Sequence, residues 1–114
     1  MSTKDNAPES ERALVRAAAL SPAARERLRR SLLPYAARET RRFMKRWNIP
    51  KKRLDELIAV GMHPFDVVFN IYVREMHHLI EEEGHFYQYF MWWVRWAISR
   101  YVYPDAYNDE EKSE

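Results

Sequence analysis

The sequence contains no cysteine, which excludes disulfide bonds, thiol catalysis and zinc sites built on cysteine. Glycine is also scarce, with two residues where average usage predicts about eight. We expect both of them, Gly61 and Gly84, to follow the ends of helices, where a left-handed backbone is wanted. A β-rich fold needs many more glycines for its turns, and no alternating strand pattern of useful length is present. These absences predict an all-α protein.

Long apolar runs are missing as well. The longest uncharged stretch in the apolar C-terminal half, Gly84–Val94, has eleven residues, against about 20 for a membrane-spanning helix. The N-terminal residues contain no apolar signal segment. We therefore expect no membrane span and a cytoplasmic location. The 114 residues, 46% hydrophobic and 32% charged, fit one globular domain.

This domain is expected to cover residues 10–104, between a disordered arm (1–9) and a disordered acidic tail (105–114). Apolar spacing and the positions of Pro, Gly and Ser predict a compact bundle of four to six short helices. The expected helices cover residues 11–20, 22–33, 35–47, 51–60, 63–83 and 85–103. Pro34 should kink or break the chain after the second helix, because proline lacks the N–H that a helix interior requires.

The formal net charge of +2 conceals a strong asymmetry along the chain. Residues 12–53 hold fourteen Lys and Arg against Glu26 and Glu39, a net charge of +12. Residues 54–114 hold four basic against twelve acidic residues, a net charge of −8. We therefore divide the domain into basic helices (10–53) and apolar helices for oligomerisation (54–104). Such asymmetry points to nucleic acid or another anionic partner.

The basic residues concentrate on two consecutive predicted helices that are joined by Asn48, Ile49 and Pro50. A cationic row on one helix face can neutralise several phosphates, and arginine binds phosphate or a guanine edge with two hydrogen bonds. Helix, short turn and helix are also compatible with a helix-turn-helix. We predict that duplex DNA contacts Arg38, Arg41, Arg42, Lys45, Arg46, Lys51, Lys52 and Arg53. The alternatives are a solvated face, or contact with the chain's own acidic half or that of a neighbouring subunit.

Nine of the sixteen aromatic residues lie in the last expected helix, within residues 86–103. A helix that is apolar nearly all round is buried from several sides, and a few short helices have difficulty covering it. We therefore predict a homo-oligomer, with an interface formed by Phe86, Phe90, Trp93, Trp96 and Tyr101. An ordinary core helix is an equal alternative. Attachment to a membrane surface and stacking of single-stranded bases on these rings are weaker ones.

A histidine and carboxylate cluster, Glu75, His78, Glu82 and His85, would share one side of a continuous helix. Its two Glu-x-x-His units are typical of di-iron bundles. Gly84 interrupts this helix, however, and no second carboxylate-rich helix is available, so we favour a hydrated polar face. No nucleophile with a base and an orienting group is visible, and two glycines cannot form a phosphate-binding loop. We predict neither metal, cofactor nor catalysis.

Two short motifs carry a family resemblance. The segment GMHPFDVV (Gly61–Val68) resembles a Gly-x-x-Pro-Leu-Glu-Val-Leu helix start found in phage terminase small subunits. The segment AISRYVYP (Ala97–Pro104) is similar to the Ala-rich helix ending in Pro-Tyr-Val-His-Pro of the same proteins. The resemblance covers about residues 54–107. It departs at Tyr103, where the family has histidine, and in the large aromatic side chains of the last helix.

The resemblance implies a non-enzymatic DNA-packaging protein that forms a ring, recognises viral DNA and engages a large packaging subunit. For such a viral protein, the expected cytoplasmic location is the host cell cytoplasm. ATPase and nuclease chemistry would belong to that large subunit, and the acidic tail (105–114) of this chain would bind it. The alternative function is a small helical interaction module, either a virion component or an inhibitor of a host enzyme. Such a module would act through its aromatic helix or its acidic tail.

Overall fold

The computed structural model describes residues 11–75 and 85–104, and these ranges contain helices and no strand. The all-α prediction is confirmed. The elements are α1 (Glu11–Ala18), α2 (Pro22–Arg46), the short 3-10 helix η2 (Lys51–Arg53), α3 (Leu54–Met62), α4 (Phe65–Glu75) and α5 (His85–Val102). The predicted arm (1–9), the acidic tail (105–114) and residues 76–84, with Gly84 and the end of the expected helix 63–83, lie outside the described residues.

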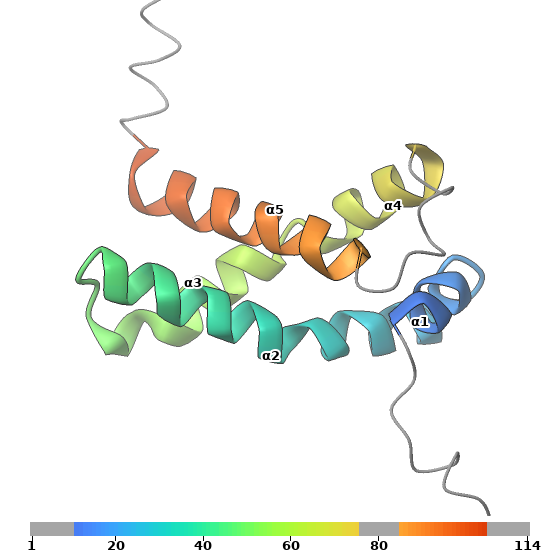
Figure 1. The fold of residues 1–114 in the computed structure, drawn as a ribbon, viewed down its shortest axis with the longest axis horizontal. Helices are drawn as coiled ribbons and strands as arrows, with labels where there is room; N and C mark the ends of the chain where they lie inside the picture. The colour runs from blue at the N-terminus through green and yellow to red at the C-terminus, as the bar shows by residue number, and fades with distance from the viewer. Residues whose placement is uncertain (1–10, 76–84, 105–114) are drawn as a thin grey trace, which may run out of the picture.

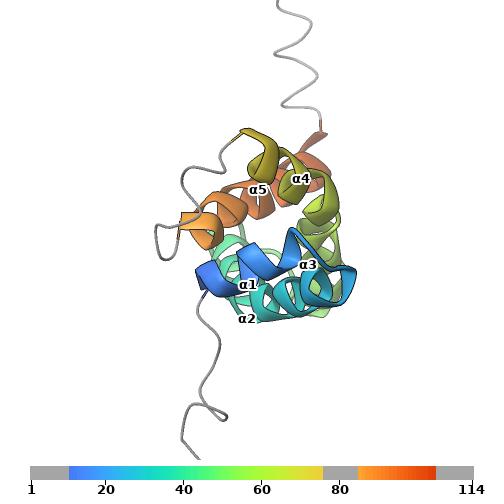
Figure 2. The same cartoon turned by 90° about the vertical axis from the view of Figure 1, so that its right-hand side faces the viewer.

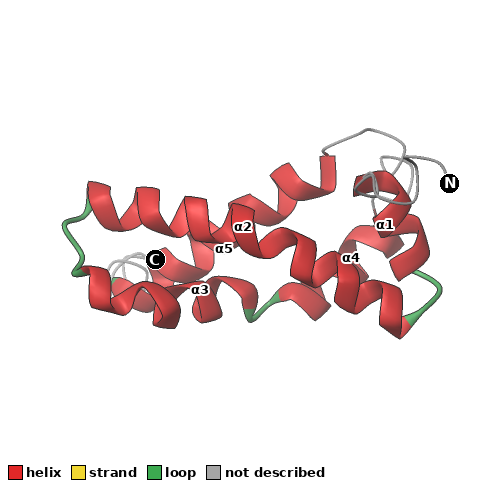
Figure 3. Cartoon of the chain, turned by 90° about the horizontal axis from the view of Figure 1, so that it is seen from below, coloured by secondary structure: helices red, strands yellow, loops and turns green. Residues whose placement is uncertain are grey.

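The helices surround one core. In Figure 1, α2 follows the lower side and α5 crosses the upper side, while α1 packs beside the N-terminal part of α2. Figure 2 looks along the long axis and shows that these helices and α3 surround a shared centre. Figure 3 shows the short loops that connect α1 to α2, α2 to η2 and α3 to α4. Helix α2 contacts both α3 and α5. Its C-terminal end lies beside the C-terminal half of α5, where the ring centroids of Trp47 and Tyr103 are 5.5 Å apart.

Helix α2 is longer than expected. Ser21 caps its start by accepting a hydrogen bond from the Ala24 N–H at 3.3 Å, and Pro22 occupies the first turn. The expected break at Pro34 was wrong, because the helix continues through this proline. One buried side chain recurs every fourth residue on both sides of it: Ala24, Leu28, Leu32, Ala36, Thr40 and Met44. Pro34 itself is exposed, so its missing hydrogen bond faces solvent, and core packing holds the helix together.

The part of the core between α4 and α5 is aromatic. Phe65, Phe69 and Tyr72 of α4 are buried against Phe86 and Phe90 of α5. Ring centroids of Phe65 and Phe90 lie 5.7 Å apart, and those of Tyr72 and Phe86 lie 4.8 Å apart, in edge-to-face arrangements. Such pairs contribute about 0.5–1.5 kcal/mol each beyond the burial of their area. These contacts hold α5 in place and fix which of its faces remains at the surface.

A buried carboxylate links α1 to the start of α5. The Glu11 side chain, 5% exposed, accepts hydrogen bonds at 3.2 Å from the backbone N–H groups of Phe86 and Tyr87. These N–H groups belong to the first turn of α5, where they have no partner within the helix and where the helix dipole is positive. Glu11 therefore caps a helix 75 residues away in sequence, which local sequence patterns cannot reveal.

Gly61 lies inside α3, so its expected position after a helix end was wrong. It faces α5 instead. A Cβ at this position would lie 2.8 Å from Cγ1 of Val94 and 3.3 Å from Cδ1 of Ile98. The absence of a side chain therefore allows the backbone of α3 to approach α5 closely.

Replacing Gly61 with alanine is expected to lower the free energy of unfolding by about 1–3 kcal/mol through overpacking. Urea denaturation measures this change. The helix propensity of alanine acts in the opposite direction by about 1 kcal/mol, and the exposed position Ala59 of the same helix isolates that effect in Ala59→Gly. A Gly61→Ala protein more stable than the wild type would contradict the close contact with Val94.

Candidate nucleic-acid interface

The turn after α2 brings two groups of cations together. Asn48 adopts a left-handed conformation with φ of 54°, and the Ile49 N–H donates to the Met44 carbonyl at 2.9 Å. Asparagine tolerates this conformation better than most residues, and Pro50 cannot continue the helix. The end predicted from Asn48, Ile49 and Pro50 is thus confirmed. The chain reverses here, which places η2 beside the last turns of α2.

The eight residues predicted to contact DNA lie on this part of the fold, and we call them together the basic end. Seven are exposed and Arg53 is half-buried. On the opposite side of α2, Ala36, Thr40 and Met44 are buried and Phe43 is partly buried. Trp47 follows the last residue of α2 and is 48% exposed.

Few carboxylates neutralise the basic end. Nη1 of Arg42 lies 3.7 Å from Oε1 of Glu39, and Nε of Arg53 lies 2.9 Å from Oε1 of Glu56. Within residues 11–75 and 85–104, no carboxylate lies within 4.0 Å of the other six cations: Arg38, Arg41, Lys45, Arg46, Lys51 and Lys52. Six of the eight cations of this surface therefore have no carboxylate partner among the described residues.

The N-terminal half of α2 differs in this respect. Glu26 accepts hydrogen bonds from Arg29 at 2.7 Å and from Arg30 at 3.1 Å, which lowers the pKa of its carboxyl to about 2. Next to η2, the hydrogen bonds that Arg53 and Tyr101 donate to Glu56 likewise lower the pKa of the Glu56 carboxyl to about 2. Both carboxylates are therefore ionised at neutral pH. The uncompensated charge lies between these two pairs, from Arg38 to Lys52.

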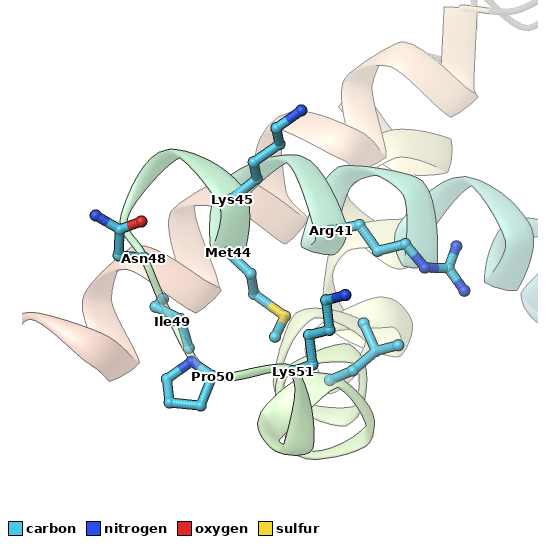
Figure 4. A pocket seen from close by; sticks show the side chains of 8 residues that line it. Arg41, Met44, Lys45, Asn48, Ile49, Pro50 and Lys51 are labelled. Carbon is cyan, nitrogen blue, oxygen red and sulfur yellow. The ribbon is translucent and has the colours of Figure 1, made fainter.

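A pocket of about 840 Å³ opens between α2 and η2. Arg41, Lys45 and Lys51 line it with their cationic side chains, over an apolar floor of Met44, Ile49, Pro50 and Leu54. Figure 4 shows Lys51 rising from η2 toward α2 and Met44 pointing toward it, whereas Lys45 points away to solvent. Cations from both sides of the turn therefore line one pocket, and none of the three has a carboxylate within 4.0 Å among the described residues.

Two other α2 cations face the other way, toward α5. Arg42 and Arg46 line a second cavity, of about 500 Å³, whose other residues are Glu39, Phe43, Trp47, Trp92, Arg95, Trp96 and Ser99. We call it the tryptophan groove. Sequence patterns do not reveal this site, because the expected helices 35–47 and 85–103 lie in separate halves of the chain. No local signal joins Trp47 to Arg95, which line the same cavity.

The second helix of the predicted helix-turn-helix does not resemble a DNA-reading helix. The residues that α3 exposes near its start are Asp55 and Glu56, and carboxylates there would repel phosphates. Its other face contacts α2 and α5. The cations lie on α2 and η2, before this helix begins.

The five residues predicted to form an oligomer interface divide into two groups. Phe86 and Phe90 are 0% exposed and belong to the core of this chain, so the prediction that they contact a second copy is corrected. Trp93 and Trp96 are partly buried. Tyr101 is 49% exposed, but its hydroxyl donates to Glu56 at 2.6 Å. Any interface on α5 is therefore limited to Trp93, Trp96 and Tyr101 among these five.

The predicted histidine and carboxylate cluster is described only in part, because His78 and Glu82 lie outside the described residues. His85 Nδ1 lies 3.0 Å from the hydroxyl of Tyr72, an interaction between α5 and α4. In the part of the chain that the structure describes, no three His, Asp or Glu side chains are grouped to hold a metal ion.

One stretch, Lys51–Glu75, is long and apolar enough to be considered as a membrane span by length and composition alone. It comprises η2, α3 and α4, and its large apolar side chains Leu57, Phe65, Phe69 and Tyr72 are buried in the core of this chain. Apolar residues of a core helix satisfy the same criterion, so this stretch does not establish a span.

No family model, curated protein or solved structure matches this chain. The resemblance to terminase small subunits therefore depends on the two short motifs alone.

Proposed function

We propose that this protein binds duplex DNA through the basic end and has no catalytic role of its own. The observation that carries this proposal is the set of six cations on α2 and η2 that have no carboxylate within 4.0 Å among the described residues. Clustered like charges repel one another unless an anion neutralises them. A polyanion removes this repulsion and gains entropy from the counterions that it releases.

The spacing of the cations favours DNA over an acidic protein surface. Arg38, Arg41 and Lys45 recur at intervals of three and four residues and so form one row on α2. The row rises by about 10 Å along the helix, a length over which a duplex carries about six phosphate charges. Lys51 and Lys52 extend the surface past the turn.

In its described part, the chain's own acidic half supplies no carboxylate within 4.0 Å of the six uncompensated cations. Glu56 is bound to Arg53 and Tyr101, Asp66 lies 4.0 Å from Arg25 at the other end of α2, and Glu75 pairs with Arg74. The uncompensated cations remain directed to solvent. This supports an external anionic ligand rather than an internal one.

A role in viral DNA packaging is the more specific form of this proposal. Its support is the resemblance of Gly61–Val68 and Ala97–Pro104 to terminase small subunits. The protein would assemble into a homo-oligomer through Trp93, Trp96 and Tyr101 and recruit a packaging ATPase through its acidic tail (105–114). A second candidate is a helical interaction module, which the half-exposed rings of Trp47, Trp92 and Tyr101 favour.

Titration of a 20-base-pair duplex at several salt concentrations tests DNA binding. With six to eight phosphate contacts, the slope of log K against log salt is expected to be about −5 to −7. Light scattering with and without the duplex gives the molar mass of the protein and its complex. A large closed ring that binds DNA supports packaging. A monomer with no affinity for the duplex at 0.1 M salt would contradict the proposal and favour the interaction module.

A further inference from the structure

The tryptophan groove combines exposed rings with guanidinium groups. Trp92 is 52% exposed and Trp47 is 48% exposed, although large aromatic side chains are usually covered. Trp47 comes from the residue after α2, and Trp92 and Trp96 come from α5. The groove therefore exists only because the two helices lie side by side.

One cation of the groove is held against one of its rings. The guanidinium carbon of Arg46 lies 5.7 Å from the centroid of Trp47. Nη1 of Arg42 lies 3.7 Å from Oε1 of Glu39, and Nη1 of Arg95 lies 3.2 Å from Oε2 of the same carboxylate. Three arginines thus line the groove with one carboxylate, which leaves its lining net positive.

We propose that the tryptophan groove binds single-stranded nucleic acid. Aromatic rings that stack bases beside cations that hold the backbone are the recurring features of single-strand sites. The volume of about 500 Å³ falls within the range of roughly 300–1,000 Å³ typical of small-ligand pockets. The groove is also continuous with the basic end, because Arg42 and Arg46 belong to both. The proposal deepens the nucleic-acid-binding function and rests on it, and separate variants test the two.

Three other occupants fit less well. A duplex keeps its bases stacked inside, so its backbone would reach the arginines but leave the rings without a partner. A second copy presenting the same groove would bring Arg42, Arg46 and Arg95 against their own equivalents. A membrane surface favours a helix with one continuous apolar face, whereas the most apolar face of α5, which includes Phe86, Phe90, Val94 and Ile98, is buried in the core.

The test compares a 12-nucleotide oligothymidylate with a 12-base-pair duplex at 0.1 M salt. Trp92→Leu is expected to weaken binding of the single strand by about 5- to 150-fold, the loss of one stacked base, and to change duplex binding less than two-fold. Trp92→Phe retains a ring and should restore most of the affinity. Arg95→Gln should also weaken single-strand binding, and Arg74→Gln, with the same change in net charge at an exposed site on α4, should not. An unchanged thermal midpoint confirms that each variant is folded.

The outcomes separate the proposals. A wild type that binds the oligothymidylate through Trp92 but not the duplex supports the groove and overturns duplex binding by the basic end. Equal losses for both ligands in Trp92→Leu, or no loss for either, would overturn the groove proposal. A wild type that does not bind the oligothymidylate would also overturn the groove proposal. In that case, loss of sedimentation with phosphatidylserine vesicles in Trp92→Leu would indicate a membrane site. A lower molar mass of Trp92→Leu would indicate a dimer.

Discussion

A variant in which Arg41, Lys45 and Lys51 are all replaced by glutamine is expected to lose most of its affinity for duplex DNA. These three cations line one pocket on both sides of the turn, and none has a carboxylate within 4.0 Å among residues 11–75 and 85–104. Each phosphate contact contributes about 0.9 to the slope of log K against log salt. The triple variant should therefore bind roughly 100- to 1,000-fold more weakly at 0.1 M salt, with a slope shallower by about 2.7.

A matched control separates a local surface from a general effect of net charge. Arg12, Arg16 and Arg74 are exposed and lie on α1 and α4, and their replacement by glutamine changes the net charge by the same amount. Helix α1 packs at the opposite end of α2 from the turn (Figure 1). This control should bind the duplex nearly as well as the wild type. Equal losses in the two triple variants would show that the basic end is not a defined site.

Truncation of Phe90 to alanine is expected to lower the free energy of unfolding by about 3–5 kcal/mol. The Phe90 ring is fully buried, and its centroid lies 5.7 Å from that of Phe65 and 6.0 Å from that of Phe86. A domain of this size has a total stability of about 5–15 kcal/mol. The loss is therefore a large fraction of the whole, and urea denaturation would detect it as a lower midpoint with a similar slope.

Trp92→Ala is the matched control for Phe90, because it removes a larger ring two positions away on the same helix. Since Trp92 is 52% exposed, its truncation should cost about 1 kcal/mol or less. Light scattering on both variants distinguishes core from interface. If Phe90→Ala left the stability unchanged and lowered the molar mass, Phe90 would belong to a subunit interface instead of the core.

Several elements were predictable because their signals are local. Ser21 with Pro22 marks the start of α2, and Asn48 with Pro50 marks its end, since capping and backbone conformation depend on neighbouring residues. The apolar stripe of α4 also follows from spacing, because its buried side chains recur at intervals of three and four residues: Phe65, Val68, Phe69 and Tyr72. The break expected at Pro34 does not occur, because side chains buried on both sides of it offset the local cost of a proline, about 3 kcal/mol.

By itself, the sequence determined the helical class, most helix ends within the described residues and the concentration of positive charge in residues 38–53. Only the tertiary structure decided which surfaces these residues share. It placed Phe86 and Phe90 in the core, used Glu11 to cap α5, and brought Trp47 of one half of the chain beside Trp92 and Arg95 of the other. The reason is physical: helix signals act over a few residues, whereas contacts between helices depend on packing between residues far apart in the chain.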